Sequence, residues 1–236
     1  MWGSSLGHSN VTATMSTPMQ RFSATEIMHI LIAYAVLTFD FWLIVSGINF
    51  FAGGQSANMF GVSFTIMGAI PVAAAVTATG FVSHEMAHKF EAQRMGLWAE
   101  FRMYPQWLVL SIIFSFIGFL FAAPGATFVG GWGSKKEAGL TSIAGPLLNL
   151  GWAALFLGMM GFILGFHLRF WNWEYIAAVF FTVAIVNMFF AVFNLIPFGP
   201  LDGKKVYNWD KRIWVVSFIA AVAVYIFFAY IIQITI

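Results

Sequence analysis

Charged residues are scarce in this 236-residue chain, in which Asp, Glu, Lys and Arg together make up 8% of the sequence. A typical soluble domain has about one quarter. Hydrophobic residues make up 61%, and the mean hydropathy is +0.85. This balance excludes a soluble enzyme, a secreted module and a disordered protein. It is typical of a helical membrane protein whose chain crosses the bilayer several times.

Cysteine is absent altogether. Its absence excludes disulfide bonds, iron–sulfur clusters and thiolate-bound zinc, so any metal must take its ligands from His, carboxylate or carbonyl groups. A strong excess of one charge is also missing, because 11 basic and 9 acidic residues give a net charge of +2. That charge is too small and too scattered for a nucleic-acid-binding surface. We therefore expect no nucleic-acid partner, and a lipid bilayer as the surroundings.

Six apolar runs follow a polar segment at residues 1–24, which we predict to be a flexible cytoplasmic tail without the features of a secretory signal. Residues 25–236 are predicted to form a single membrane-embedded domain. A helix needs about 20 residues to cross a bilayer, and only the third run is marginal in length. The fold class predicted is therefore all-α, with five to six transmembrane helices. The runs are Ile27–Phe51, Met59–Ser83, Trp107–Ala123, Leu140–Phe166, Tyr175–Phe198 and Trp214–Ile236.

Asp40 is the only formal charge deep inside one of these runs. An ionisable side chain in hydrocarbon is costly and is by default a functional candidate. No motif surrounds Asp40, however, so we favour a hydrogen bond to a neighbouring helix as its role.

Residues 84–88, directly after the second run, read His-Glu-Met-Ala-His. On a helix, positions four apart share a face, so His84 and His88 can bind one cation while Glu85 stands beside the open coordination position. Zinc is the natural metal for this pattern. A catalytic zinc usually has three protein ligands, so a third ligand is needed. The metzincin class would supply a histidine at the position that holds Arg94 here, and it is therefore excluded.

Asp202 stands out among the remaining acids as a candidate third ligand. It lies in the segment Asn194–Gly203, where two prolines and two glycines end the fifth run. Irregular backbone at membrane depth can turn a carboxylate inward where protein or trapped water satisfies its amides. Taken alone, the segment is more simply interpreted as a helix stop with a solvated aspartate.

Three separated motifs together give the chain a resemblance to the site-2 proteases, a family of intramembrane zinc metalloproteases. They are the His-Glu-Met-Ala-His motif, the Ala-Gly-Pro-Leu-Leu-Asn stretch at residues 144–149 and the segment Asn194–Gly203. The resemblance implies that His84, His88 and Asp202 hold zinc and that Glu85 is the catalytic acid/base. It also implies that Asn194 lies near the active site. There its amide could bind the substrate backbone or the developing oxyanion, and a structural bond between helices is an equal alternative.

The third run, Trp107–Ala123, is a departure from the smallest family members, which have a short strand-rich loop here. His88 and Asp202 must lie on the same side of the membrane to share a metal, and three runs separate them. If the third run returns to its own side, every Lys and Arg except Arg169 is cytoplasmic, as the positive-inside bias favours. We therefore predict that this run is re-entrant, that residues 123–133 bring the chain back as an extended segment, and that the active site lies toward the cytoplasm.

The predicted function is zinc-dependent hydrolysis of a peptide bond in or near the transmembrane segment of a membrane-protein substrate. A helical substrate must unwind locally before such a bond becomes accessible, and pairing with the extended return segment would stabilise the unwound state.

The strongest alternative is a polytopic metal transporter that uses the His/Glu/Asp cluster as a transport site. It requires a polar path through runs that, apart from Asp40, are nearly free of charge. A diiron oxygenase needs many clustered histidines, and the chain has five. A scaffold with a dead site is disfavoured because all four proposed site residues are present.

Overall fold

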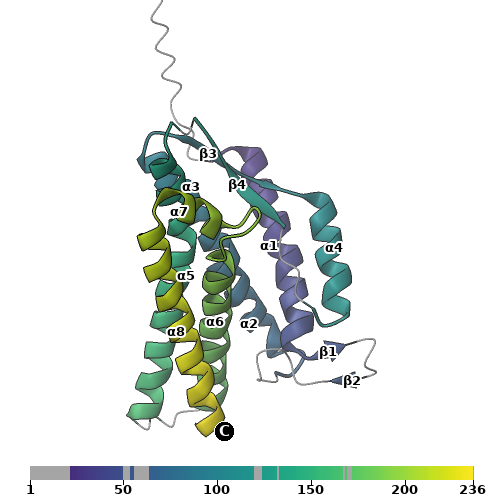
Figure 1. Cartoon of the computed structure of the whole chain (residues 1–236). Coiled ribbons are helices and arrows are strands. Elements are labelled where there is room, and N and C mark those ends of the chain that lie inside the picture. Colours follow the sequence, from purple (N-terminus) through teal and green to yellow (C-terminus); the bar gives the residue numbers. More distant parts are fainter. Residues whose placement is uncertain are drawn as a thin grey trace, which may run out of the picture.

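The computed structural model describes residues 22–49, 54–55, 64–119, 124–131, 133–166, 168 and 172–235, and it is mostly helical (Figure 1). Most of the predicted N-terminal tail, residues 120–123 of the third apolar run and Arg169 lie outside the described residues. The elements are α1 (Ala24–Val45), β1 (Ile48–Asn49), β2 (Gly54–Gln55), α2 (Ala69–Val76), the π-helix η1 (Thr77–Val82), α3 (Ser83–Arg94), β3 (Trp98–Met103), α4 (Pro105–Phe116), β4 (Gly125–Gly130), α5 (Lys135–Gly165), α6 (Trp173–Asn194), α7 (Asp202–Trp209) and α8 (Lys211–Thr235).

The helices follow the apolar runs, and side-chain caps fix two of their starts. The Ser23 hydroxyl accepts a hydrogen bond from the Glu26 backbone N–H at 3.0 Å and begins α1. Ser134 and Glu137 form a reciprocal capping box that begins α5. Three helices in the described part of the chain, α1, α5 and α6, are long and apolar enough to cross a membrane. The predicted count of five to six spans is not confirmed.

The second apolar run does not form a single regular helix. Its helical part passes from α2 into the π-helix η1, which leads directly into α3. The His-Glu-Met-Ala-His motif therefore begins within one turn of a π-helical segment. α4 is also shorter than its run, with 12 residues and a length of about 18 Å at 1.5 Å per residue. That length is well below the ~30 Å of a bilayer core.

The fold is mostly helical, as predicted, and in addition β3 and β4 form an antiparallel pair. The return segment predicted at residues 123–133 contains β4, whereas β3 was not predicted. Met103 pairs with Gly125, and the Tyr104 backbone N–H donates to the Pro124 carbonyl oxygen at 2.8 Å. The excursion that contains α4 therefore leaves and re-enters the same end of this two-stranded sheet.

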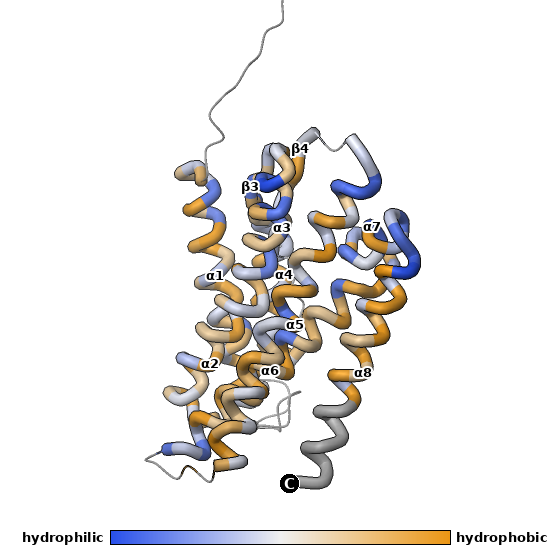
Figure 2. The backbone as a smooth tube through the Cα atoms, turned by 90° about the vertical axis from the view of Figure 1, so that its left-hand side faces the viewer, coloured by the Kyte–Doolittle hydropathy of each residue, from blue (hydrophilic) through white to orange (hydrophobic). Residues whose placement is uncertain are grey.

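The apolar core lies between the helices, and polar residues gather at one end of the molecule. One cluster of buried residues joins α1, α2 and α6, a second joins α1, η1, β3 and α4, and a third joins α5 and α6. Figure 2 shows the hydrophilic segments concentrated at the end that carries β3, the start of α5 and α7. α3 lies at the same end in Figure 1. The motif helix and the helix that begins with Asp202 are thus placed together.

Asp40 has the structural role predicted for it. Its Oδ2 atom accepts a hydrogen bond from the Ser111 hydroxyl at 2.6 Å, and both side chains are buried. This bond joins α1 to α4, whereas the hydrogen-bond partners of His84 and His88 outside α3 lie in α5 and α7.

Candidate metal centre

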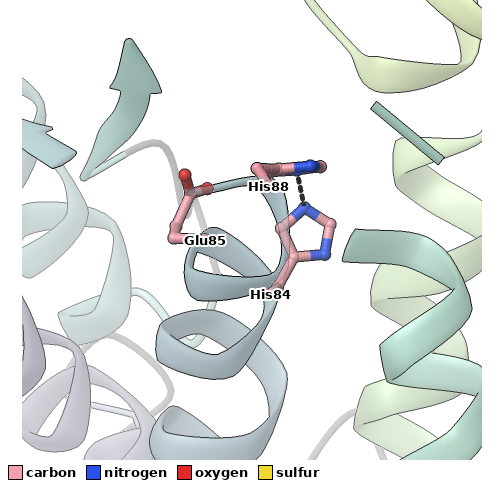
Figure 3. A group of neighbouring side chains, drawn as sticks. All are labelled: His84, Glu85 and His88. Carbon is pink, nitrogen blue, oxygen red and sulfur yellow. Dashed lines mark hydrogen bonds between the residues drawn. The ribbon is translucent and has the colours of Figure 1, made fainter. Parts of the chain in front are cut away.

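His84 and His88 lie one helical turn apart on α3, and their imidazole rings meet edge to face (Figure 3). The two Nε2 atoms are 3.0 Å apart, and both side chains are buried. Since helix positions four apart share a face, the local sequence alone accounts for this pairing.

Asp202, the first residue of α7, contacts the Nε2 atoms of both histidines. Its Oδ2 atom lies 3.3 Å from His84 Nε2 and 3.0 Å from His88 Nε2. The approach depends on Gly203, since a Cβ atom there would lie 2.1 Å from the Leu195 carbonyl oxygen at the end of α6. The glycine lets the start of α7 pack directly on the α6 backbone, which directs the preceding aspartate inward.

The hydrogen-bond partners of the two rings decide which nitrogens face this point. His84 Nδ1 lies 2.6 Å from Asn149 Oδ1, and His88 Nδ1 lies 2.7 Å from the Thr141 carbonyl oxygen. A carbonyl oxygen can only accept, so each Nδ1 carries a proton, and in the neutral ring Nε2 then holds the lone pair that a metal takes. Partners of this kind are typical of metal-bound histidines.

The three facing atoms therefore fit a shared cation. Two lone pairs and a carboxylate oxygen at 3.0–3.3 Å from one another repel unless a positive charge lies among them. Ligands of a tetrahedral zinc at 2.0–2.1 Å are about 3.3 Å apart. The donor set also has the nitrogen and oxygen atoms that zinc prefers, so the residues fit that metal.

Asp202 is present as the carboxylate that a metal requires. Burial alone would raise the pKa of its carboxyl group, but attraction to a protonated His88 and hydrogen bonds from the two imidazoles hold that pKa well below its ordinary value. A bound metal would take the place of that proton. The side chain thus stays ionised even though it is almost completely enclosed.

Gly145 forms the wall against which both rings rest. A Cβ atom at this position would lie 2.6 Å from Cε1 of His84 and 2.6 Å from Cε1 of His88. Only glycine lets α5 approach the two imidazoles so closely. The sequence motif that contains this residue therefore has a direct steric role beside the site.

Glu85 points toward β4, away from the partners that hold the rings (Figure 3). Its Oε2 atom accepts a hydrogen bond from the Thr127 backbone N–H at 2.8 Å, and the Thr127 hydroxyl donates to its carbonyl oxygen at 3.0 Å. One ligand atom from each of His84, Glu85 and His88 lies within 4.8 Å of the others. The Asp202 Oδ2 atom is closer to the two Nε2 atoms, at 3.3 and 3.0 Å. We therefore take Asp202 as the third ligand and Glu85 as a residue beside the metal position.

Asn194 is the predicted site residue whose described contact lies elsewhere. Its amide Nδ2 donates to the Phe190 carbonyl oxygen at 3.0 Å, within its own helix.

Three residues that contact the site were given no role by the sequence analysis: Thr141, Thr127 and Gly145. The Ala-Gly-Pro-Leu-Leu-Asn stretch was a signal for the last of these and for Asn149, but a backbone acceptor such as the Thr141 carbonyl leaves no sequence signal.

Comparison with known proteins supports the chemistry of this site. A protein of Methanocaldococcus jannaschii named "Putative zinc metalloprotease MJ0611" is 32% identical over 198 residues, which are 83% of this chain and 90% of that protein. No family model matches the chain, and no solved structure matches it. The identity extends far beyond the three short motifs.

Proposed function

Because the chain belongs to the zinc metalloprotease family of its Methanocaldococcus relative, we propose that it is an intramembrane protease of the site-2 type. In this proposal it hydrolyses a peptide bond in or near the transmembrane segment of a membrane-protein substrate. The observation that carries the proposal is the meeting of His84, His88 and Asp202 within 3.3 Å in a chain with three bilayer-length apolar helices.

Zinc is the cofactor, and His84, His88 and Asp202 would hold it. Bound zinc lowers the pKa of a water molecule and polarises the carbonyl group of a peptide bond. Glu85 takes the proton from the attacking water and passes it to the leaving nitrogen. The Thr127 N–H holds one oxygen of this carboxylate, so the other remains available for the proton.

The outer edge of β4 suits an unwound substrate. The Thr127 N–H bonds to Glu85, so this edge of the strand faces α3 and not β3. An extended substrate segment that pairs along it would pass beside Glu85. Strand pairing would also satisfy the backbone groups that a substrate exposes when its helix unwinds. Asn194, at the end of α6, is proposed to contact the substrate backbone near the same place.

The proposed protein is multi-pass, with five to six spans and the active site toward the cytoplasm. The closed excursion through α4 supports a re-entrant third run, because Tyr104 and Pro124 meet at 2.8 Å and the helix is too short to cross. The polar end of the molecule in Figure 2 would then lie at the cytoplasmic surface. The bilayer and a transmembrane protein substrate are the partners, and nucleic acid is not one.

A cleavage assay tests this function. The purified chain is reconstituted in lipid vesicles with a synthetic single-span peptide, and the products are identified by mass spectrometry. We expect cleavage within or beside the hydrophobic segment, loss of cleavage with a chelator, and recovery when zinc is restored. Glu85→Gln should abolish cleavage, whereas Glu91→Gln, the same change on α3 at a residue paired with Arg94, should not.

The alternative of a metal transporter gives a different result in the same vesicles. A transporter would move zinc across the vesicle membrane and leave the peptide intact. Zinc uptake without any cleavage product would overturn the protease proposal.

A further inference from the structure

The second nitrogen of His84 begins a chain of hydrogen bonds that leads away from the metal centre into α6. Asn149 in α5 accepts from His84 Nδ1 at 2.6 Å, and its own Nδ2 atom lies 2.9 Å from Asn187 Oδ1 in α6. Asn149 and Asn187 are both 0% exposed. Buried amides among apolar helices cost free energy unless their polar atoms are paired, so the completeness of this chain is informative.

The far end of the chain fixes the orientation of Asn187. The Thr79 hydroxyl donates to the Ala75 carbonyl oxygen at 2.8 Å, so it accepts from Asn187 Nδ2 at 2.9 Å. The same Nδ2 atom donates to the Val183 carbonyl oxygen at 2.8 Å. Both of its hydrogens are therefore used, and Oδ1 must face Asn149 as an acceptor.

The orientation passes on to Asn149 and then to the ring. Asn149 Nδ2 donates to Asn187 Oδ1 and to the Gly80 carbonyl oxygen at 3.0 Å, which uses both of its hydrogens. Asn149 Oδ1 is left to face His84, and an amide oxygen can only accept. The proton of the imidazole must therefore lie on Nδ1, and its Nε2 lone pair faces Asp202.

We propose that Asn187 and Asn149 are positioning residues that hold His84 in the tautomer a zinc ligand needs. The inference rests on the proposed function, since it assigns a purpose to the free Nε2 atom. Neither amide touches the metal position or Asp202 in the described contacts. They act through His84, and the direction of every bond in the chain is set by the Thr79 hydroxyl in η1, the segment that continues directly into α3.

The π-helix η1 supplies the other half of the arrangement. The Ser83 N–H bonds to the Ala78 carbonyl oxygen, five residues back, so the Thr79 carbonyl does not receive it. Asn149 Nδ2 instead reaches the Thr79 and Gly80 carbonyl oxygens at 3.4 and 3.0 Å. One side chain thus binds both the irregular turn and the ring that follows it, which fixes His84 relative to the start of α3.

His88 provides an internal comparison. Its Nδ1 atom bonds to the Thr141 backbone carbonyl, which no side-chain substitution removes. Changes at Asn149 or Asn187 should therefore disturb one of the two imidazole ligands and leave the other in place. The expected result is weakened zinc binding and not its complete loss.

The test is the zinc affinity of the full chain in detergent, measured by competition with a chromophoric chelator. Asn149→Leu, which removes the acceptor, should weaken binding about 10- to 100-fold, and Asn187→Leu about tenfold. Thr182→Val is the matched control in α6, because the Thr182 hydroxyl is buried and has no hydrogen-bond partner in the described part of the chain. It should bind zinc like the parent.

Asn149→Asp separates positioning from a purely structural role. This variant keeps an acceptor for His84 Nδ1 but loses both donated bonds and buries a charge, so it disturbs packing at least as much as Asn149→Leu. We expect it to bind zinc at least about tenfold more tightly than Asn149→Leu, because carboxylate–histidine–zinc arrangements are effective. The cobalt-substituted protein should show the parent visible spectrum in Asn149→Asp and an altered one in Asn149→Leu.

Equal zinc affinities for Asn149→Leu and Asn149→Asp would overturn the proposal. If Asn149→Leu does not fold, equal affinities for Asn187→Leu and Thr182→Val would overturn it instead. Failure of the parent to bind zinc would count against the proposed function itself. Zinc binding by the parent together with unchanged binding by the variants would remove only the positioning role.

Discussion

Gly145→Ala is the substitution whose effect follows most directly from the geometry of the metal centre. The added Cβ atom would lie 2.6 Å from a carbon of each imidazole and 2.7 Å from His84 Nε2. Carbon atoms in contact prefer a separation of about 3.5 Å or more, so each ring would have to withdraw by about 0.9 Å. If α5 moved instead, the bond between His84 and Asn149 would lengthen by a similar amount.

Displacements of this size exceed what a zinc site tolerates. Ligand distances in such sites are kept to within about 0.2 Å. We therefore expect Gly145→Ala to lower zinc affinity by more than about 100-fold, beyond the usual effect of residues that only support a ligand. Overpacking of this kind also destabilises a fold by about 1–3 kcal/mol.

Gly151→Ala, in the same helix, is the control for this experiment. Nothing lies within 4 Å of a Cβ atom at that position. Removing a glycine from a helix interior stabilises it by about 0.5–1 kcal/mol, so this variant should unfold at the same or higher temperature and keep parent zinc affinity. Zinc competition titrations and thermal unfolding in detergent compare the two. Parent-like zinc affinity in Gly145→Ala would refute the steric reasoning.

Further substitutions test other contacts. Asp202→Ala removes one of the three proposed ligands, and metal analysis after dialysis should find less zinc than in the parent; full retention would exclude Asp202 as a ligand. Thr127→Pro removes the N–H that holds the Glu85 carboxylate, together with the hydroxyl that donates to the Glu85 carbonyl oxygen, without breaking the pairing of β4 with β3. Loss of a hydrogen bond to a charged group, about 1.5–3 kcal/mol, should slow cleavage about 10- to 100-fold with zinc retained. Unchanged turnover would remove this positioning contact. Glu26→Ala breaks the buried pair that Glu26 forms with Lys89 at 2.5 Å, and denaturant unfolding should show a loss of about 3–5 kcal/mol. Recovery of most of that loss in Glu26→Leu combined with Lys89→Met is expected, and its absence would place the effect elsewhere.

The parts of the site that the sequence could predict depend on local spacing or on several motifs together. His84 and His88 share a helix face at any site where that helix forms. The approach of Asp202 could be expected only because the separate motifs occur together, and its physical cause, the packing of Gly203 on the end of α6, is a tertiary contact.

The parts that could not be predicted depend on non-local contacts. β3 is a six-residue strand whose partner, β4, follows only after the α4 excursion, so β3 depends on a distant segment and gives no strong local signal. The π-helix likewise has no local pattern. It depends on Asn149 from α5 and on the close approach of α6, where a Cβ atom on Gly80 would lie 2.9 Å from the Phe190 ring.

The central claim is that His84, His88 and Asp202 share one zinc ion. X-ray absorption at the zinc edge of the purified protein tests it most directly. The account predicts one bound zinc per chain with two imidazole nitrogens at about 2.0–2.1 Å, and loss of one oxygen ligand in Asp202→Ala. A zinc environment with fewer than two imidazoles, or one that is unchanged in Asp202→Ala, would contradict it.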